Sequence, residues 1–494
     1  MTRFSWLKTG ALAFSLLGFV GCAQAQPTPD SLQTVRAYAD TLIERGRDTY
    51  GAEHSPLFAA TLDRENLTVF EKAPPAPGGI RNHDRALWGA NPMHDQNLYQ
   101  VLYALSKITG DAKYSREADA ALKFFFENCQ SEVTGLMTWG EHLSWGFRKD
   151  ARSKQNWQDD IHEFFRPWVL WDKTFVLAPK PAKKFALGLW NHQIYDQKTG
   201  AFSRHAKWSS HGPETDSEYP RHGGFYIQTW AKAWEKTGDE TFLKAIETLV
   251  GFFEKQKNSI TGAIAGERKT PELLWTNSNL SLAISLSEAA PALPPPLKNR
   301  VTALADSTDA VYLKMKHELL PGGKGFIGNA VASTLEPGDK TERGVSKNGF
   351  YSRTWATGYG ESTDAAAAMN CLTRYHQTKN EGYKNLVLQT ARRYLTSFPD
   401  PKIEIFPQAY GEAIALLLGA YRLEKSPEFL EAAKGLGVLA QEKFFDGSAL
   451  PRASTRVSHY ESITRGDTLA MALLDLWAIE NKPELDLGLV WTER

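Results

Sequence analysis

The stretch Thr109-Gly-Asp-Ala-Lys-Tyr114 recurs in related form at three later places, each time between two amphipathic segments. The related stretches are Thr237-Gly-Asp-Glu-Thr-Phe242, Thr378-Lys-Asn-Glu-Gly-Tyr383 and Lys425-Ser-Pro-Glu-Phe429. In each of them, small, Gly or Pro residues end one helix, an Asp, Asn or Ser can cap the next helix, and the aromatic residue begins its apolar face. The last two stretches lie about one helical hairpin apart, and the earlier gaps are roughly three times as long. The pattern predicts an array of helical hairpins.

Apolar residues on either side of these joints follow helical spacing. Leu98, Leu102 and Leu105 lie at i, i+4 and i+7 before the first joint. Between residues 31 and 479 we count about thirteen or fourteen such segments, and few segments alternate as strands do. We therefore expect an all-α fold, an (α/α)6 or (α/α)7 toroid, formed by residues 26–494 as a single catalytic domain.

Composition narrows the class of partner. The chain has 494 residues, of which 42% are hydrophobic and 12% aromatic, so it can bury a large core. Its 57 basic and 57 acidic residues cancel, which removes the positive charge expected of a nucleic-acid-binding protein. We expect no nucleic-acid partner, and any anionic ligand must meet a local basic patch.

Residues 1–25 have the form of a secretory signal peptide. A short basic region precedes the apolar run Ala11–Val20, and Ala23-Gln-Ala25 provides a cleavage site. The apolar run is too short to span a bilayer. Gly21-Cys22 also resembles the end of a bacterial lipoprotein signal (residues 1–21), in which case a lipidated Cys22 would attach the protein to a membrane. The expected location is periplasmic, outer-membrane lipoprotein or secreted.

The mature chain offers few obvious metal ligands. Cys129 and Cys371 lie in helical patterns and are expected to be buried apolar side chains. His94, His142 and His162 could join a His/Asp/Glu site, but no two of these histidines have the spacing that places both on one helix face. We expect no metal and no cofactor.

Several long loops combine aromatic residues with hydrogen-bonding ones. The loop from Gly135 to Gly146 carries Trp139, Glu141, His142 and Trp145. Rings beside polar groups suit carbohydrate, whose C–H faces stack on aromatics while its hydroxyls need polar partners; the alternative is that the rings pack the inner helices. Further candidates for substrate binding are Trp275, Asn277, Tyr351, Arg353 and Tyr410.

The doublets Arg204-His205 and Arg221-His222 suggest a reaction. Arg can hold a uronate carboxylate, and removal of the proton beside that carboxylate needs a base and a group that protonates the leaving oxygen. Cationic neighbours stabilise the charge that develops. A β-elimination site could thus combine an Arg of either doublet with His205 or His222 as base and a nearby tyrosine, Tyr226 or Tyr219.

Two other functions remain open at this point. Glu141, Glu163, Glu361 and Glu412 could supply the acid and base of a glycoside hydrolase, whose carboxylate separation the sequence does not reveal. The same aromatic cleft could also serve a non-catalytic glycan-binding lipoprotein. All three readings have a polysaccharide or oligosaccharide as partner.

The hairpin joints, the signal segment and the Trp/His/Arg loops resemble those of the secreted bacterial six-hairpin toroid enzymes, which are polysaccharide lyases and glycosidases. The segment Asn91–Ala118 and the ending Tyr460-Glu-Ser-Ile-Thr-Arg-Gly-Asp-Thr-Leu-Ala470 are similar to proteins described as pectate-lyase-like. The resemblance implies a toroid fold and a uronate polysaccharide substrate.

Overall fold

The computed structural model describes residues 30–154, 161–210, 217–338, 351–355 and 362–494. The predicted signal segment and Cys22 lie outside the described residues, as does Glu361. In the described part no helix is both long and apolar enough to cross a membrane.

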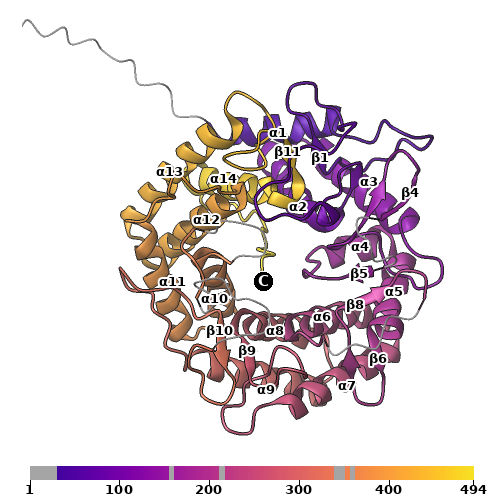
Figure 1. Ribbon diagram of the computed structural model, residues 1–494, viewed down its shortest axis with the longest axis vertical. Coiled ribbons are helices and arrows are strands. Elements are labelled where there is room, and N and C mark those ends of the chain that lie inside the picture. The colour runs from indigo at the N-terminus through magenta and orange to yellow at the C-terminus, as the bar shows by residue number, and fades with distance from the viewer. Residues whose placement is uncertain (1–29, 155–160, 211–216, 339–350, 356–361) are drawn as a thin grey trace, which may run out of the picture.

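Fourteen α-helices of the described chain form a ring (Figure 1). The odd-numbered helices lie on the outside and the even-numbered helices on the inside, so the all-α toroid predicted from the sequence is confirmed. The helices are α1 (Ser31–Arg45), α2 (Pro92–Thr109), α3 (Lys113–Asn128), α4 (Trp171–Leu177), α5 (Pro179–Gly188), α6 (Pro220–Thr237), α7 (Glu240–Gln256), α8 (Thr276–Ala289), α9 (Pro295–Tyr312), α10 (Asp364–Thr378), α11 (Glu381–Tyr394), α12 (Pro407–Glu424), α13 (Pro427–Ala440) and α14 (Gly466–Asn481).

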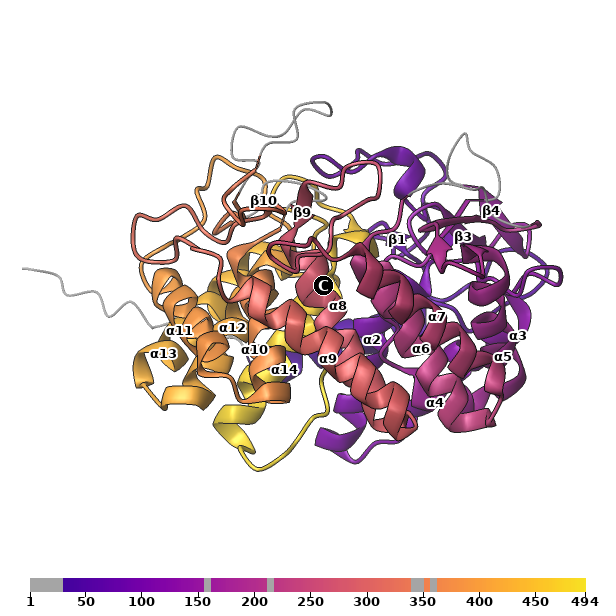
Figure 2. The same ribbon diagram turned by 90° about the horizontal axis from the view of Figure 1, so that it is seen from below.

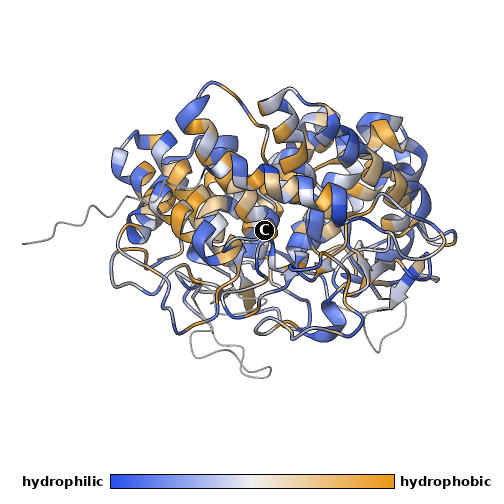
Figure 3. Ribbon diagram, turned by 90° about the horizontal axis from the view of Figure 1, so that it is seen from above, coloured by the Kyte–Doolittle hydropathy of each residue, from blue (hydrophilic) through white to orange (hydrophobic). Residues whose placement is uncertain are grey.

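Apart from the short α4, the inner helices are largely buried, because they pack against the outer helices and against one another. In α12, for example, residues 409–420 are all buried. The outer helices carry an apolar stripe on one face only, as amphipathic surface helices do. Most strongly hydrophobic residues accordingly lie on the helices (Figure 3). Inner helix α4 is only seven residues long, and the chain around it forms loops and short strands instead.

The repeated joints form as their residues predict. Gly110 and Gly238 end α2 and α6 in the left-handed conformation, with φ of 75° and 66°. Asp239 and Asn380 cap α7 and α11 by accepting a hydrogen bond from the backbone N–H two residues later. These caps satisfy backbone groups that a helix end would otherwise leave without partners.

Short antiparallel strands gather at one end of the ring (Figure 2). The pair β5–β8 carries the candidate site, and the pair β1–β11 joins the first and last parts of the chain. The strands are β1 (Thr61–Leu62), β2 (Gly89–Ala90), β3 (Leu143–Gly146), β4 (Ala151–Lys154), β5 (Ile161–Glu163), β6 (Ile194–Asp196), β7 (Ala201–Phe202), β8 (His205–Lys207), β9 (Leu273–Trp275), β10 (Asn329–Val331) and β11 (Tyr460–Glu461).

The last residues, 490–494, run into the centre of the ring (Figure 1). Val490 exchanges two hydrogen bonds with Gln100 of α2, at 2.7 and 2.9 Å. The Glu493 carboxylate lies 3.0 Å from Arg465 and 3.2 Å from Arg166. Arg494 forms a fork-like ion pair with Glu288 of α8. This tail therefore ties together inner helices that lie on different sides of the ring.

Candidate active site

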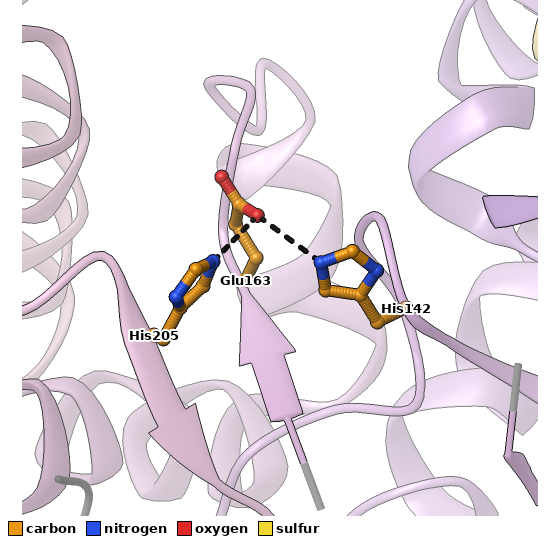
Figure 4. Close-up of side chains that lie close together, drawn as sticks. All are labelled: His142, Glu163 and His205. Atoms are coloured by element: carbon orange, nitrogen blue, oxygen red, sulfur yellow. Dashed lines mark hydrogen bonds and ion pairs between the residues drawn. The ribbon is translucent and has the colours of Figure 1, made fainter. Parts of the chain in front are cut away.

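The site is built around Glu163, the last residue of β5. In the antiparallel register of β5 and β8, Glu163 lies directly opposite His205, which brings the two side chains together. His205 Nε2 is 3.1 Å from Glu163 Oε2. His142, which immediately precedes β3, points its Nε2 at the same oxygen from 3.9 Å (Figure 4). Three segments of the chain thus place two imidazoles on one carboxylate oxygen.

The other oxygen of Glu163 has different partners. Arg204 Nη1 donates to Oε1 at 2.8 Å, and His222 Nε2 lies 3.4 Å from it. His222 and Arg221 belong to the first turn of α6, where the helix dipole also favours a nearby anion. Both residues of the first doublet and His222 of the second therefore contact Glu163, and the catalytic roles assigned to these residues stay predictions.

The charges of the cluster are strongly coupled. Burial opposes ionisation of Glu163, but Arg204, His205 and His222 outweigh it and hold the pKa of this carboxyl well below its usual value. Burial and the neighbouring Glu163 charge raise the pKa of Glu141 to about 9. Burial lowers the pKa of His222 to about 3, which keeps its ring neutral.

His142, Glu163 and His205 could together hold a metal ion, since one ligand atom from each lies within 4.8 Å of the others. Two imidazole nitrogens and one carboxylate oxygen are a donor set that suits Zn²⁺ and other divalent transition metals. Sequence reasoning expected no metal because it looked for two histidines on one helix face. The ligands come instead from two strands and a loop, and strand register has no local signal in the sequence.

A second group consists of Asp84, Glu141 and His142, so it shares His142 with the first group. One ligand atom from each of these residues also lies within 4.8 Å of the others. Asp84 lies in the 3-10 turn Asn82–Asp84 and is bound by the guanidinium of Arg81. Sequence reasoning missed Asp84 because it comes from a turn with no distinguishing motif.

Arg221 differs from Arg204 in the ion pairs that its guanidinium makes with described residues. Among the described residues no carboxylate lies within ion-pair distance of its guanidinium. Its backbone N–H donates to Ser278 at 3.0 Å. The charges of Glu163, Glu141 and Glu493 all act on it from further away. Arg221 is therefore available to bind an anionic ligand.

The aromatic rings of Tyr219 and Trp275 extend from Arg204 toward the start of α8. The Arg204 guanidinium carbon lies 4.8 Å from the ring centre of Tyr219, and the Tyr219 ring centre lies 4.3 Å from that of Trp275. Trp275 and Asn277 flank the start of α8, and Asn277 donates to Ser362 at 3.3 Å. These two predicted substrate-binding residues thus belong to the same side of the ring as the doublets.

Three predicted site residues are buried in the core, which corrects their assignment. Trp139 has 0% of its surface exposed, with its ring centre 4.8 Å from that of Trp168, so it has no face left for a sugar. Tyr226 is also fully buried and donates to Gln193. Tyr410 has 0% exposure and packs against other aromatic rings. The presence of aromatic residues in loops does not by itself predict which of their rings are buried in the core and which lie at the surface.

The remaining candidates are partly exposed, except for His142, which is buried. Trp145 lies in β3 opposite Arg152 of β4. Tyr351 donates to Glu318 at 2.7 Å, and Arg353 is bridged to Thr363 at the start of α10. Glu141 accepts from Arg81 beside His142 at 2.7 Å. Of these residues, Glu141 and His142 lie in the cluster around Glu163.

Residues 75–258 match the model of the family described as "Periplasmic pectate lyase". That range contains His142, Glu163, His205 and both doublets. A pectate disaccharide-lyase of Dickeya dadantii (strain 3937) is 24% identical over 127 residues. The alignment covers 26% of this chain and 23% of that protein's length.

Solved structures of similar fold include a heparin-specific unsaturated glucuronyl hydrolase, with 12% identity and a TM-score of 0.44 over 92% of this chain and 98% of that chain. The cellobiose 2-epimerase of Bacillus thermoamylovorans has 10% identity and a TM-score of 0.47 over 91% and 98%. The family match over residues 75–258 confirms the predicted resemblance to pectate-lyase-like proteins.

Proposed function

We propose that this chain is an exported polysaccharide lyase that cleaves a uronate-containing polysaccharide by β-elimination, assisted by a divalent cation bound to His142, Glu163 and His205. The observation that carries the proposal is the meeting of His142, His205 and Arg204 on the single buried carboxylate of Glu163. The family match supports the choice of a pectate-like substrate.

The reaction removes the proton beside a uronate carboxylate, and the resulting negative charge is shared with that carboxylate. A bound divalent cation would neutralise this charge and make the ring proton more acidic. Arg221, which has no ion-pair partner among the described carboxylates, is assigned to bind the substrate carboxylate. Arg204 is assigned to hold Glu163 as a carboxylate, because its guanidinium donates to Oε1.

His205 can act as a cation ligand or as a base, but not as both at once, because the same Nε2 faces Glu163. We assign His205 as a ligand of the cation. His222 is 0% exposed, and we assign it to stabilise the Glu163 carboxylate. The C5–H electron pair forms the C4–C5 double bond as the C4–O bond breaks, so one proton leaves the sugar and one reaches the leaving oxygen. We assign both transfers to the Tyr219 hydroxyl, which accepts the C5 proton as it gives its own proton to the leaving oxygen, while the Arg204 guanidinium lies against the Tyr219 ring.

The hydrolase alternative is less well supported. Burial and the charge of Glu163 raise the pKa of Glu141, and both carboxylates approach the same nitrogen of His142, at 3.6 and 3.9 Å. The two carboxyl groups of a retaining glycosidase lie about 5 Å apart, and those of an inverting one lie further apart. Glu412 bonds to Thr363 and Gln408, away from this cluster.

The test is to incubate the purified protein with a panel of uronate polysaccharides, including polygalacturonate, and to follow the absorbance of the unsaturated product. A lyase produces this chromophore, a hydrolase produces only new reducing ends, and a binding protein produces neither. Treatment with a chelator should abolish the absorbance change, and adding back one divalent cation should restore it. Full activity after chelation would return His205 to the role of base and remove the cation from the proposal.

A further inference from the structure

The two ring nitrogens of His142 face different carboxylates. Nε2 points to Glu163 Oε2 at 3.9 Å and to Glu141 Oε2 at 3.6 Å. Nδ1 lies 3.3 Å from Asp84 Oδ1, which is its nearest carboxylate oxygen among the described residues. His142 consequently belongs to both candidate metal groups, and the function of the second group depends on what Asp84 does.

Asp84 is held rigidly and is fully buried. Its side chain has 0% of its surface exposed, and the Arg81 guanidinium binds it as a fork, with Nε 2.6 Å from Oδ2 and Nη2 3.1 Å from Oδ1. The same Nη2 donates to Glu141 Oε1 at 2.7 Å. Arg81 therefore fixes the position of the Asp84 carboxylate beside His142.

This arrangement disfavours Asp84 as a metal ligand. Both of its oxygens already accept from Arg81, whose positive charge would repel a cation placed between Asp84 and Glu141. Glu163 differs, because its Arg204 contact uses only Oε1 and leaves Oε2 to the two imidazoles. The cation is therefore better placed in the group of His142, Glu163 and His205.

We propose that Asp84 is a positioning residue for His142: its carboxylate accepts a hydrogen bond from Nδ1–H and so holds the ring proton on Nδ1, which leaves Nε2 unprotonated and facing the cation position at Glu163. A neutral imidazole carries one proton, and a ring with that proton on Nε2 cannot bind a metal through Nε2. Carboxylates commonly orient metal-binding histidines in this way. In this structure Nδ1 lies 3.3 Å from Asp84 Oδ1 without forming a hydrogen bond, so the proposal requires the ring to reorient toward Asp84. The inference rests on the proposed metal centre.

The first experiment measures Zn²⁺ binding to the chelator-treated protein by calorimetry. Asp84→Asn keeps the shape of the side chain but no longer favours the proton on Nδ1, so we expect the affinity for Zn²⁺ to fall about 10- to 100-fold. Glu163→Gln, which removes a ligand, should abolish binding at this site. Asp309→Asn is the matched control, since Asp309 is also a buried carboxylate held by an arginine fork, with Arg374 in α10, outside the cluster. Its Zn²⁺ affinity should stay at the parent value.

Two results would overturn the inference. Parent-like affinity in Asp84→Asn would show that Asp84 does not orient His142, and a loss as complete as in Glu163→Gln would make Asp84 a ligand. If the parent itself binds no Zn²⁺, the metal centre of the proposed function fails together with the inference. If Asp84→Asn does not fold, nitrogen NMR of histidine-labelled parent protein decides the question, because a His142 proton on Nε2 contradicts the proposal.

Discussion

At the scale of one residue, the two carboxylate oxygens of the buried Glu163 have different partners. Its Oε1 meets Arg204 and its Oε2 meets His205, so one oxygen is tied to the protein and the other faces two potential metal ligands. The sequence pointed to both doublets by their composition, but it did not identify Glu163 as their meeting point. That role depends on strand pairing between residues about forty positions apart, which residue type alone does not encode.

Arg221 gives the first prediction at this scale. Replacing it with Ala should remove a charged contact to the uronate carboxylate, which is typically worth roughly 1.5–3 kcal/mol and so about 10- to 100-fold in kcat/KM. Kinetics on pectins of increasing methyl esterification test this, because an ester has no charge for Arg221 to bind. The parent should prefer the unesterified polymer, and a variant that keeps the same preference would contradict the assignment.

Trp139 and Trp145 give a second prediction, because they differ in burial although they lie only six residues apart in the chain. Trp139 is 0% exposed, so Trp139→Ala should leave a large cavity and cost about 3–5 kcal/mol of stability. Trp145 is partly exposed, so Trp145→Ala should weaken glycan binding by about 1–3 kcal/mol with a smaller loss of stability. Thermal melts and glycan titrations of both variants separate the two effects, and equal losses of stability would refute the distinction.

At the scale of elements, the helices were predictable and the site was not. Inner and outer helices keep apolar spacing over many residues, and the joints between them carry Gly, Asp or Asn at positions where the backbone requires them. The short strands β5 and β8 have three residues each, too few for a periodic pattern to identify them. The ligands of the candidate metal centre lie on or beside such strands, which explains why the sequence suggested no metal.

The joints between helices predict that substitutions at two left-handed positions change the stability of the protein in opposite directions. Gly110 has a φ of 75° and Lys379 a φ of 57°, both in the left-handed region. A methyl group at Gly110 would meet no other atom within 4 Å, so Gly110→Ala should cost only the backbone strain, about 1 kcal/mol. Lys379→Gly should relieve strain of similar kind and stabilise the protein by a few tenths of a kcal/mol to about 1 kcal/mol. Denaturant unfolding measures both, and changes of the same sign would contradict the reasoning.

At the scale of the complete fold, two sets of contacts join the first and last parts of the ring. Helices α2 and α14 pack side by side, and strand β1 pairs with β11, so the start and end of the described chain meet. Residues 490–494 then cross the centre and bring Glu493 between Arg166 and Arg465. No repeat or motif in the sequence predicts this tail, because its partners are single polar residues from separate parts of the chain.

The last prediction concerns the charge in this centre. Burial, and after it the nearby charge of Glu493, raise the pKa of Glu412 in α12 to about 7. The unfolded chain releases this proton at a lower pH, near 4.5, so between these two values the folded state binds more protons and stability falls as the pH rises. The contribution of Glu412 should therefore be full at pH below 4.5 and lost above pH 7, by at most about 3 kcal/mol. Glu412→Gln cannot ionise, so its stability should fall less than that of the parent between pH 5 and 8. Denaturant titrations of both proteins across this range test the claim, and parallel pH profiles would show that Glu412 ionises as easily in the folded ring as in the unfolded chain.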